Sequence, residues 1–482
     1  WLVGLLRAVG GAVVDGDGEE DPADADAALE FVVEDPAAKV KGPLLSGVKE
    51  TVDALGVGKE EAAKALGVTR DAERDLRSIE IAAESRELCQ KADNRSVRHV
   101  TLRLPEGASK YRAGDHLEVL PNNDPGLVAT ALSVLELEEA TPVVWDRIKA
   151  TRSNRSVRDT DGSLRGALPV MRITAKLVLE WIPDLTAVPN RKSIGRLARA
   201  VKDESIRERL QSLSTDQDKY KQEVVTPSVS LAELLQSCAG KLSLSIGELC
   251  ALAKPLAPRY YSVSSSPEGA ADPRLVTVSV GQVEFQTGTG RTHHGLASTM
   301  LGSLSAGSCV PGCVRQLTGN FHVPDDPLAP MIMVGPGTGI APMMGFLQER
   351  QSRLKKGQKL GHAILFFGCR KCNEDYIYRD ELAAFLESGA LTELHVAFSR
   401  EGPQKVYVQD LIFEHRASCW RLLQQHSAAI FVCGDARAMA PDVRRAFQRV
   451  AQECGGKSEA KAASMLGAMV ENGRYLEDVW AS

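Results

Sequence analysis

The stretch MIMVGPGTGIAPMMGFLQER, residues 331–350, decides the fold of the C-terminal part of the chain. A short apolar run is followed by a turn that contains Gly335, Gly337 and Gly339, and then by a segment with helical spacing. Glycines at such a turn let the backbone approach a pyrophosphate at the positive end of the following helix. The spacing is GxGxG with Pro342 close behind, rather than the more common GxGxxG. The stretch therefore predicts a strand, a nucleotide-binding turn and a helix.

Three further apolar runs continue this pattern towards the C-terminus. They are AILFFG (363–368), LHVAFS (394–399) and AIFVCG (429–434), and each ends where a loop with Gly or Ser begins. Short runs that are apolar throughout are typical of a parallel sheet buried on both faces. Because strands alternate with helical patterns, we expect a doubly wound parallel α/β domain over residues 326–482.

Strand-like alternation replaces this order further upstream. It covers residues 97–104 and 116–120, and it resumes between Arg259 and Val323. Residues 125–250 instead have helical spacing, as in LVATALSVLEL and SIGRLARAVKDESIRERLQSL. We therefore predict an antiparallel β barrel in two parts, 88–124 and 251–325, interrupted by a helical connecting insertion over 125–250.

The first 87 residues carry weaker signals. Residues 15–29 are acidic and rich in Ala, Asp and Gly, which is typical of a linker, and residues 47–90 look helical and polar. The opening WLVGLLRAVGGAVV is too short to span a bilayer and lacks the basic start and cleavage site of a signal peptide. We interpret residues 1–87 as the remnant of an upstream domain with a linker, without a membrane segment.

Bulk composition excludes several classes of function. A hydrophobic content of 43%, a charged content of 25% and a net charge of -5 give no bulk attraction to nucleic acid or anionic membrane. Ten cysteines are scattered, and the one CxxC, formed by Cys369 and Cys372, lacks a second pair at zinc-site spacing. We expect no metal site and a reducing, cytoplasmic setting.

The sharpest local signal for chemistry is PRYYSVSSSP, residues 258–267. Arg259 can pair bidentately with a phosphate, and alternate aromatic and hydroxyl side chains on a strand can contact a ring and its polar atoms. GLAS at 295–298 stands where a helix is expected to begin, so its amides and a cap hydroxyl can bind an anion. Each motif alone also fits a surface strand or an ordinary helix N-terminus.

These motifs belong to a series that resembles the NADPH–cytochrome P-450 reductase family of diflavin reductases. The series is RYYS (259–262), GLAS (295–298), GPGTGIAP (335–342), FFGCR (366–370), FSR (398–400) with KVYVQ (405–409), FVCGDAR (431–437) and GRYLEDVW (473–480). The resemblance extends over residues 88–482. YRAGDHLEVLPNN (111–123) and the ending DVWAS are most similar to the reductase part of fused, self-sufficient cytochrome P-450 monooxygenases.

The resemblance implies an FAD-binding barrel of the ferredoxin reductase type and an NADP-binding domain, and it assigns roles to residues. Ser262, Cys433 and Asp478 would surround the site of hydride transfer, and Trp480 would cover the flavin face where nicotinamide must arrive. The FAD residues that it implies are Arg259, Tyr261, Ser262, Thr277, Val278, Ser279, Val280, Gly295, Leu296, Ala297, Ser298 and Trp480. The NADPH residues are Gly337, Thr338, Gly339, Cys369, Arg370, Ser399, Arg400, Lys405, Tyr407, Gln409, Cys433, Gly434 and Asp435.

Ser399, Arg400, Lys405 and Tyr407 favour NADPH over NADH. A ribose 2'-phosphate needs cationic donors and a ring that covers adenine, whereas NAD sites usually place a carboxylate on the free hydroxyl. Glu401 is inconsistent with this pattern. Because Arg400 and Lys405 bracket it, we expect its side chain to point to solvent.

The resemblance also implies the partners. Hydride would pass from NADPH to FAD, and single electrons would leave through an FMN domain to a haem protein, cytochrome P-450. Nothing before residue 88 offers the phosphate loop or stacking aromatics of an FMN domain, so the FMN and haem domains are expected upstream in the same polypeptide. The alternatives are a single-flavin reductase serving a separate flavodoxin or ferredoxin, a sulfite reductase flavoprotein, and a non-catalytic NADPH-binding regulatory module. The helical insertion favours the diflavin group by resemblance.

Overall fold

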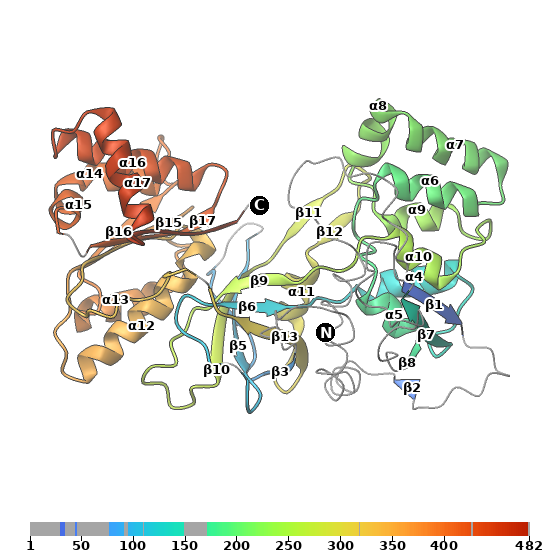
Figure 1. Cartoon of the computed structure of the whole chain (residues 1–482), viewed down its shortest axis with the longest axis horizontal. Helices are drawn as coiled ribbons and strands as arrows, with labels where there is room; N and C mark the ends of the chain where they lie inside the picture. Colours follow the sequence, from blue (N-terminus) through green and yellow to red (C-terminus); the bar gives the residue numbers. More distant parts are fainter. Residues whose placement is uncertain are drawn as a thin grey trace, which may run out of the picture.

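The computed structural model describes residues 29–33, 44–45, 77–90, 95–108, 110–148, 171–317, 319–425 and 428–480. These residues form three neighbouring parts in Figure 1: a layered α/β part at the left, an antiparallel sheet at the centre and a mostly helical part at the right. The central part lies between the other two, so it contacts both.

The central sheet is antiparallel, with its strands in the order β10-β5-β3-β13-β6-β9 and with β4 paired to β5. Just beyond β9, Val263 forms a bridge with Val278 of β10, so the two ends of the sheet are joined. Alternate residues face one shared core, as Val276, Val278 and Val280 do along β10. The strands are β3 (Arg77–Ile81), β4 (Arg86–Glu87), β5 (Val97–Arg103), β6 (His116–Val119), β9 (Arg259–Ser262), β10 (Leu275–Gly281) and β13 (Cys309–Arg315).

This sheet begins earlier in the chain than the sequence pattern predicts. β3 lies inside the segment 47–90, for which the polar pattern predicts helix, yet it pairs with both β5 and β13. Ile79 and Ile81 of β3 are buried in the barrel core. The first part of the barrel therefore includes residue 77 and does not start at residue 88. RSIEI is a short alternating run among polar residues, which is why its strand signal is weak.

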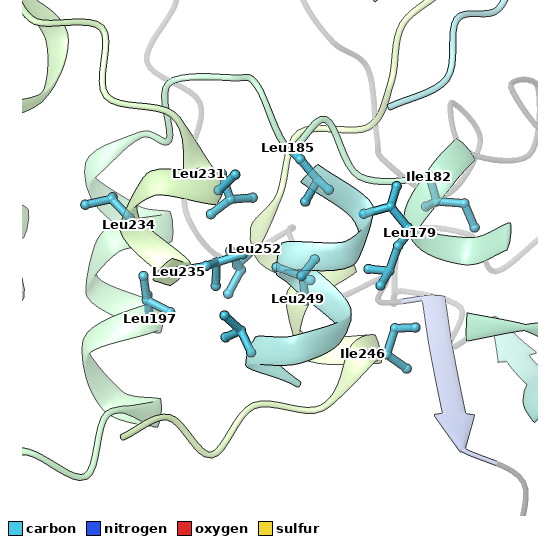
Figure 2. Packing of buried hydrophobic residues seen from close by; sticks show 14 of the residues in the cluster. Leu179, Ile182, Leu185, Leu197, Leu231, Leu234, Leu235, Ile246, Leu249 and Leu252 are labelled. Atoms are coloured by element: carbon cyan, nitrogen blue, oxygen red, sulfur yellow. The ribbon is translucent and has the colours of Figure 1, made fainter. Parts of the chain in front are cut away.

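The insertion is built mainly of helices. Figure 2 shows its core, in which leucines and isoleucines from several helices meet. Ser230 and Ser245 start two of these helices as N-caps, each in a capping box with the glutamate three residues later. The helices are α4 (Pro125–Val134), α5 (Ala175–Trp181), α6 (Arg191–Ala200), α7 (Glu204–Thr215), α8 (Gln217–Tyr220), the π-helix η2 (Lys221–Val225), α9 (Leu231–Ser237) and α10 (Ile246–Leu252).

The insertion also contains strands, which the helical prediction over 125–250 did not include. β7 (Pro142–Ile148) pairs antiparallel with β8 (Met171–Thr174). Two strands from the N-terminal part of the chain, β1 (Leu29–Val33) and β2 (Leu44–Leu45), extend this sheet in the order β1-β7-β8-β2. Part of the segment 1–87 is therefore built into the insertion. Such pairing joins residues far apart in sequence, so local periodicity does not predict it.

The C-terminal part is the predicted parallel α/β domain. Its five strands are all parallel and lie in the order β16-β15-β14-β17-β18. The strands are β14 (Met331–Val334), β15 (Ala363–Cys369), β16 (Glu393–Phe398), β17 (Ala429–Asp435) and β18 (Tyr475–Trp480). Figure 1 shows α12 (Ala341–Lys355) and α13 (Arg379–Ser388) on one face of the sheet. The other face carries α14 (Val408–Glu414), α15 (Arg416–Leu423), α16 (Met439–Glu453) and α17 (Glu459–Glu471).

None of the helices that the structure describes is both long enough and apolar enough to cross a bilayer.

Candidate active site

Ser262, Cys433 and Asp478 come together where the barrel meets the parallel sheet. The Ser262 hydroxyl donates to Asp478 Oδ2 at 2.6 Å, and the Cys433 thiol donates to the same oxygen at 3.6 Å. Strand register explains part of this grouping, because Cys433 is the direct partner of Asp478 across β17 and β18. Ser262 arrives from the barrel as the last residue of β9. Ser262 and Cys433, two of the four candidate catalytic residues, therefore share the carboxylate of a third, Asp478.

His116 completes this group, although the sequence pattern does not single it out. Its Nε2 lies 2.9 Å from Asp478 Oδ1. His116 begins β6 and is the direct partner of Ser262 across β6 and β9, so both residues reach Asp478 from the barrel. The motif that contains His116 contributes to the family resemblance. A histidine in a strand carries no role by itself, so only the fold reveals its partner.

The surroundings favour an ionised Asp478 and a neutral Cys433. Burial raises the pKa of Asp478, but its contacts with His116, Ser262 and Cys433 outweigh this and leave the pKa below its ordinary value. Burial, together with the nearby carboxylate, raises the pKa of Cys433 well above its ordinary value. The group thus holds one negative charge among a hydroxyl, a thiol and an imidazole, which suits charge balance and positioning rather than nucleophilic attack.

Trp480 stands beside this group on β18. It pairs with Asp435 of β17, and its carbonyl accepts a hydrogen bond from Ala436 N at 2.9 Å. Asp478 and Trp480 are two residues apart in a strand, so their side chains lie on the same face. Trp480 is 40% exposed, so its indole is free to cover a planar ring next to Asp478.

The glycine-rich turn packs against the end of β17. A Cβ on Gly339 would lie 2.2 Å from Cys433 O, so only glycine fits there. Gly337 has a φ of 58°, and a Cβ on it would lie 2.9 Å from Arg95 Nη2. The turn forms a short 3-10 helix, η3 (Gly337–Ile340), before α12 begins, rather than opening directly into the α-helix.

Arg95 is a further candidate that sequence patterns did not reveal. Its Nη1 donates to Asp375 Oδ2 at 2.9 Å, and Asp375 Oδ1 also accepts from the backbone amides of Arg370 and Lys371. Arg95 precedes β5 of the barrel, whereas Asp375 belongs to the α/β part, so this ion pair links the two. A guanidinium beside Gly337 provides the charge that a pyrophosphate at this turn would need.

The candidate NADPH residues gather at one edge of the parallel sheet, where ligands bind in doubly wound folds. They follow the carboxyl ends of four strands: 337–339 after β14, 369–370 at β15, 399–400 after β16 and 433–435 at β17. Cys369, the last residue of β15, is buried at this edge, and burial raises the pKa of its thiol to about 12. Gln409 lies in α14 and donates weakly to Asp442 at 3.4 Å.

Arg400 and Lys405 have the properties expected of a phosphate site. Both side chains are exposed, and within the described ranges no carboxylate forms an ion pair with either. Tyr407, 44% exposed, precedes α14, and the Ser399 hydroxyl donates to Cys369 O at 3.3 Å. Arg400 and Lys405, which have no acidic partner among the described residues, suit a phosphate, and the exposed ring of Tyr407 suits an attached base.

Glu401 is exposed, as expected, but its carboxylate has a partner. It accepts a hydrogen bond from the backbone amide of Cys372. This contact holds Glu401 on the loop after β15, so its charge is not paired with the cations on either side of it.

The candidate FAD residues in the barrel differ in whether their side chains are free to contact a ligand. Arg259 Nη1 donates to Ala257 O at 2.6 Å, and among the described residues it has no carboxylate partner, so its charge is available to an anion. Tyr261 packs against the barrel core, and burial raises its pKa to about 12. Arg259 and Tyr261 are two residues apart on β9 and therefore share a face.

Gly295 to Ser298 lie at a helix start, as predicted. Gly295 is the N-cap of α11 (Leu296–Ser303), and no described side chain caps this helix. The Ser298 hydroxyl is not the expected cap, because it donates to Gly295 O at 3.0 Å and accepts from Val283 N at 3.3 Å. The amides of the first turn are therefore left for an anion.

Thr277 to Val280 lie in β10, but their side chains are engaged within the protein. Val278 and Val280 are buried in the barrel core. The two hydroxyls each lie 2.8 Å from another hydroxyl, Thr277 from Ser264 and Ser279 from Tyr378. Contact between this strand and a flavin therefore stays a prediction.

Comparison with known proteins shows which domains and proteins this chain is similar to. Residues 77–300 match an FAD binding domain, and residues 333–445 match an oxidoreductase NAD-binding domain. The chain is 34% identical over 413 residues to the NADPH–cytochrome P450 reductase of Bos taurus, an alignment covering 84% of this chain and 58% of that protein. It is 36% identical over 402 residues to the bifunctional cytochrome P450/NADPH–P450 reductase 1 of Bacillus subtilis, covering 83% of this chain and 36% of that protein. The chain is thus similar to NADPH–cytochrome P450 reductases across its FAD-binding and NAD-binding regions.

The chain spans less than two thirds of the length of these relatives. It covers 58% of the Bos taurus reductase and 56% of the Homo sapiens reductase, to which it is 34% identical over 397 residues. The matched FAD-binding region begins at residue 77, which agrees with the placement of β3 in the barrel.

The residues of this chain fit the two cofactors that the matched domains imply. The FAD side offers the Arg259 guanidinium and the first amides of α11. The NADPH side offers the Gly337 turn beside Arg95, together with Arg400 and Lys405. All ten cysteines are free thiols, and no described cluster of His, Cys, Asp and Glu could hold a metal ion.

Proposed function

We propose that this chain is the FAD- and NADPH-binding half of an NADPH–haemoprotein reductase. It takes hydride from NADPH onto FAD and passes electrons singly, through an FMN domain, to the haem of a cytochrome P450. The observation that carries this proposal is the group of Ser262, Cys433 and Asp478, held by His116, at the sheet edge that also carries the candidate NADPH residues.

The two cofactors supply the hydride chemistry, and the chain supplies position and charge. Asp478 provides a fixed negative charge where a nicotinamide ring becomes positive as its hydride leaves. His116 occupies one carboxylate oxygen of Asp478, and Ser262 and Cys433 donate to the other, so the carboxylate cannot rotate freely. Ser262 and Cys433 thereby place a neutral hydroxyl and a neutral thiol beside this charge.

Trp480 is proposed to cover the flavin face until nicotinamide displaces it. Its exposed indole on the same face of β18 as Asp478 supports this role. Displacing an aromatic ring costs free energy. NADPH can offset that cost through contacts between its 2'-phosphate and the cations Arg400 and Lys405, which NADH cannot make.

The FMN and haem domains are proposed to belong to the same parent polypeptide. The name of the Bacillus subtilis relative joins a cytochrome P450 and its reductase in one protein, of which this chain covers 36%. A reducing, cytoplasmic setting is part of the proposal, and ten free thiols support it.

Anaerobic mixing of the FAD-loaded chain with NADPH tests the proposal. We expect loss of the visible flavin absorbance in step with NADPH oxidation, and Asp478→Asn should slow it about 10- to 100-fold because a charge at the transition state is lost. A flavin that stays oxidised while NADPH binds would instead support a non-catalytic regulatory module. Rapid electron delivery to flavodoxin or ferredoxin, without an FMN domain, would support the single-flavin alternative.

A further inference from the structure

A β hairpin links the barrel to the FAD-side helix α11. Its strands are β11 (Glu284–Gln286) and β12 (Thr292–His294), and Figure 1 shows it reaching from the barrel towards the helical insertion. At its base, Gly295 N donates to Val283 O at 2.8 Å, which fastens the hairpin to the start of α11. Phe285 is 48% exposed and lies across from His293, with ring centroids 4.7 Å apart. The hairpin therefore presents an aromatic pair beside the anion-binding turn.

The tip of this hairpin rests on the insertion. Gly288 N donates to Pro227 O at 3.0 Å, and a Cβ on Gly288 would lie 2.6 Å from Pro227 Cα. The Thr289 hydroxyl donates to Glu233 Oε1 at 2.7 Å, and Arg291 Nε donates to Glu233 Oε2 at 3.1 Å. One carboxylate of the insertion thus contacts both sides of the hairpin tip.

Glu233 is held in place at the start of helix α9. It is the capping-box residue of α9, where its Oε2 accepts from Ser230 N at 2.8 Å. Leu231, Leu234 and Leu235 of the same helix are buried in the insertion core that Figure 2 shows. Burial raises the pKa of Glu233, but its hydrogen bonds and Arg291 outweigh this and leave the pKa below its ordinary value. The carboxylate is therefore charged at neutral pH and anchored by its helix.

We infer that Glu233 positions the β11–β12 hairpin, and that through this contact the insertion sets how tightly the adenosine end of FAD is held. A pyrophosphate at the first amides of α11 leaves the adenosine to extend along the hairpin, where the exposed ring of Phe285 can stack on a base. A hairpin that is already held loses less conformational entropy when the ligand binds. Glu233 is thus a positioning residue, acting through Arg291 and Thr289.

Flavin titrations of the apoprotein test this role. We expect Glu233→Gln to raise the FAD dissociation constant about 3- to 10-fold, since one partly buried, charged contact is lost. The affinity for FMN, which lacks the adenosine, should not change. Arg291→Gln removes the same ion pair without touching the α9 cap, so it should give the same selective loss even if Glu233→Gln disturbs the helix.

Glu248→Gln is the matched control. Glu248 makes the same capping box with Ser245 at the start of α10, with Ser245 N donating at 2.8 Å, and no described contact joins it to the hairpin. It should leave both flavin affinities unchanged. Equal losses of FAD and FMN affinity, an equal effect of Glu248→Gln, or unchanged FAD affinity in both Glu233→Gln and Arg291→Gln would each overturn the inference. None of these outcomes bears on the haem acceptor, because only flavin binding is measured.

Discussion

Arg400 and Lys405 are single side chains whose charge is proposed to decide which nucleotide this chain prefers. Both are exposed at the loop after β16, close in sequence to the exposed ring of Tyr407. The pKa of the neighbouring Arg370 is lowered by burial and by the nearby charges of Arg95 and Arg400. Cations are therefore concentrated where the nucleotide residues meet, and an anion there would relieve their mutual repulsion.

Removing either cation should weaken NADPH selectively. We expect Lys405→Ala and Arg400→Ala each to raise the NADPH dissociation constant about 10- to 100-fold, because a charge-assisted hydrogen bond to the 2'-phosphate is lost. NADH binding should change little. Lys359→Ala, which removes an exposed cation from the same domain, is the control. Equal losses for NADPH and NADH would show that these residues serve the fold or a shared part of the ligand.

The strands β6 and β18 belong to different parts of the molecule, and the contact between His116 and Asp478 joins them. The folded protein holds the pKa of Asp478 below its ordinary value. The unfolded chain therefore binds the proton more readily, and the stability from this carboxylate is present above its ordinary pKa. It is lost as the pH falls through the lowered, folded value. Activity that needs the ionised Asp478 should decline in the same window.

The contact between His116 and Asp478 predicts how the pH dependence of flavin reduction should change when His116 is replaced. His116→Gln removes a contact that lowers the pKa of Asp478, so the acid limb of flavin reduction by NADPH should move to higher pH. Single-turnover reduction measured across the acid range would show the shift, with Asp478→Asn as the variant in which that limb disappears. An acid limb that keeps its position in His116→Gln would show that another group controls it.

Sequence patterns predict a strand well where the residues of that strand alone show its apolar pattern. β14, β15 and nearly all of β17 are recognisable because they are apolar and buried on both faces, whereas β16, with the sequence ELHVAF, is only partly buried. β3 and β18 are not recognisable in this way, because RSIEI and YLEDVW mix charged and apolar residues. Their pairing depends on partners elsewhere in the chain, as when β18 lies beside β17 at the edge of the sheet.

At the scale of the whole molecule, the links between parts are what the sequence does not predict. Arg95 pairs with Asp375, and the Tyr378 hydroxyl lies 2.9 Å from His99 Nδ1 and 2.8 Å from Ser279 Oγ. Each of these contacts joins residues far apart in the chain, so no local spacing encodes them. Ser262, Cys433 and Asp478 are predicted from the family resemblance of their motifs. That they meet at one carboxylate, together with His116, is visible only in the folded structure. The proposed nucleotide site therefore depends on how the barrel and the α/β part pack.

The proposed electron path runs from the FAD of this chain to a separate FMN domain, and the chain spans 58% and 56% of two reductase relatives. Ferricyanide is small and can accept single electrons from an exposed flavin, whereas a protein acceptor such as cytochrome c needs a docking partner. We expect the FAD-loaded chain to reduce ferricyanide with NADPH but to reduce cytochrome c poorly. Adding the FMN domain of the parent polypeptide should restore cytochrome c reduction.

When the FMN domain is added as a separate protein, the restored rate should rise with its concentration. When the two are fused, the rate should no longer depend on protein concentration, because the linker fixes an effective concentration. Asp478→Asn should slow both acceptors alike, since it acts before the electrons leave FAD. Cytochrome c reduction as fast as ferricyanide reduction by the isolated chain would contradict the diflavin assignment. It would mean that the flavin of this chain serves protein acceptors directly.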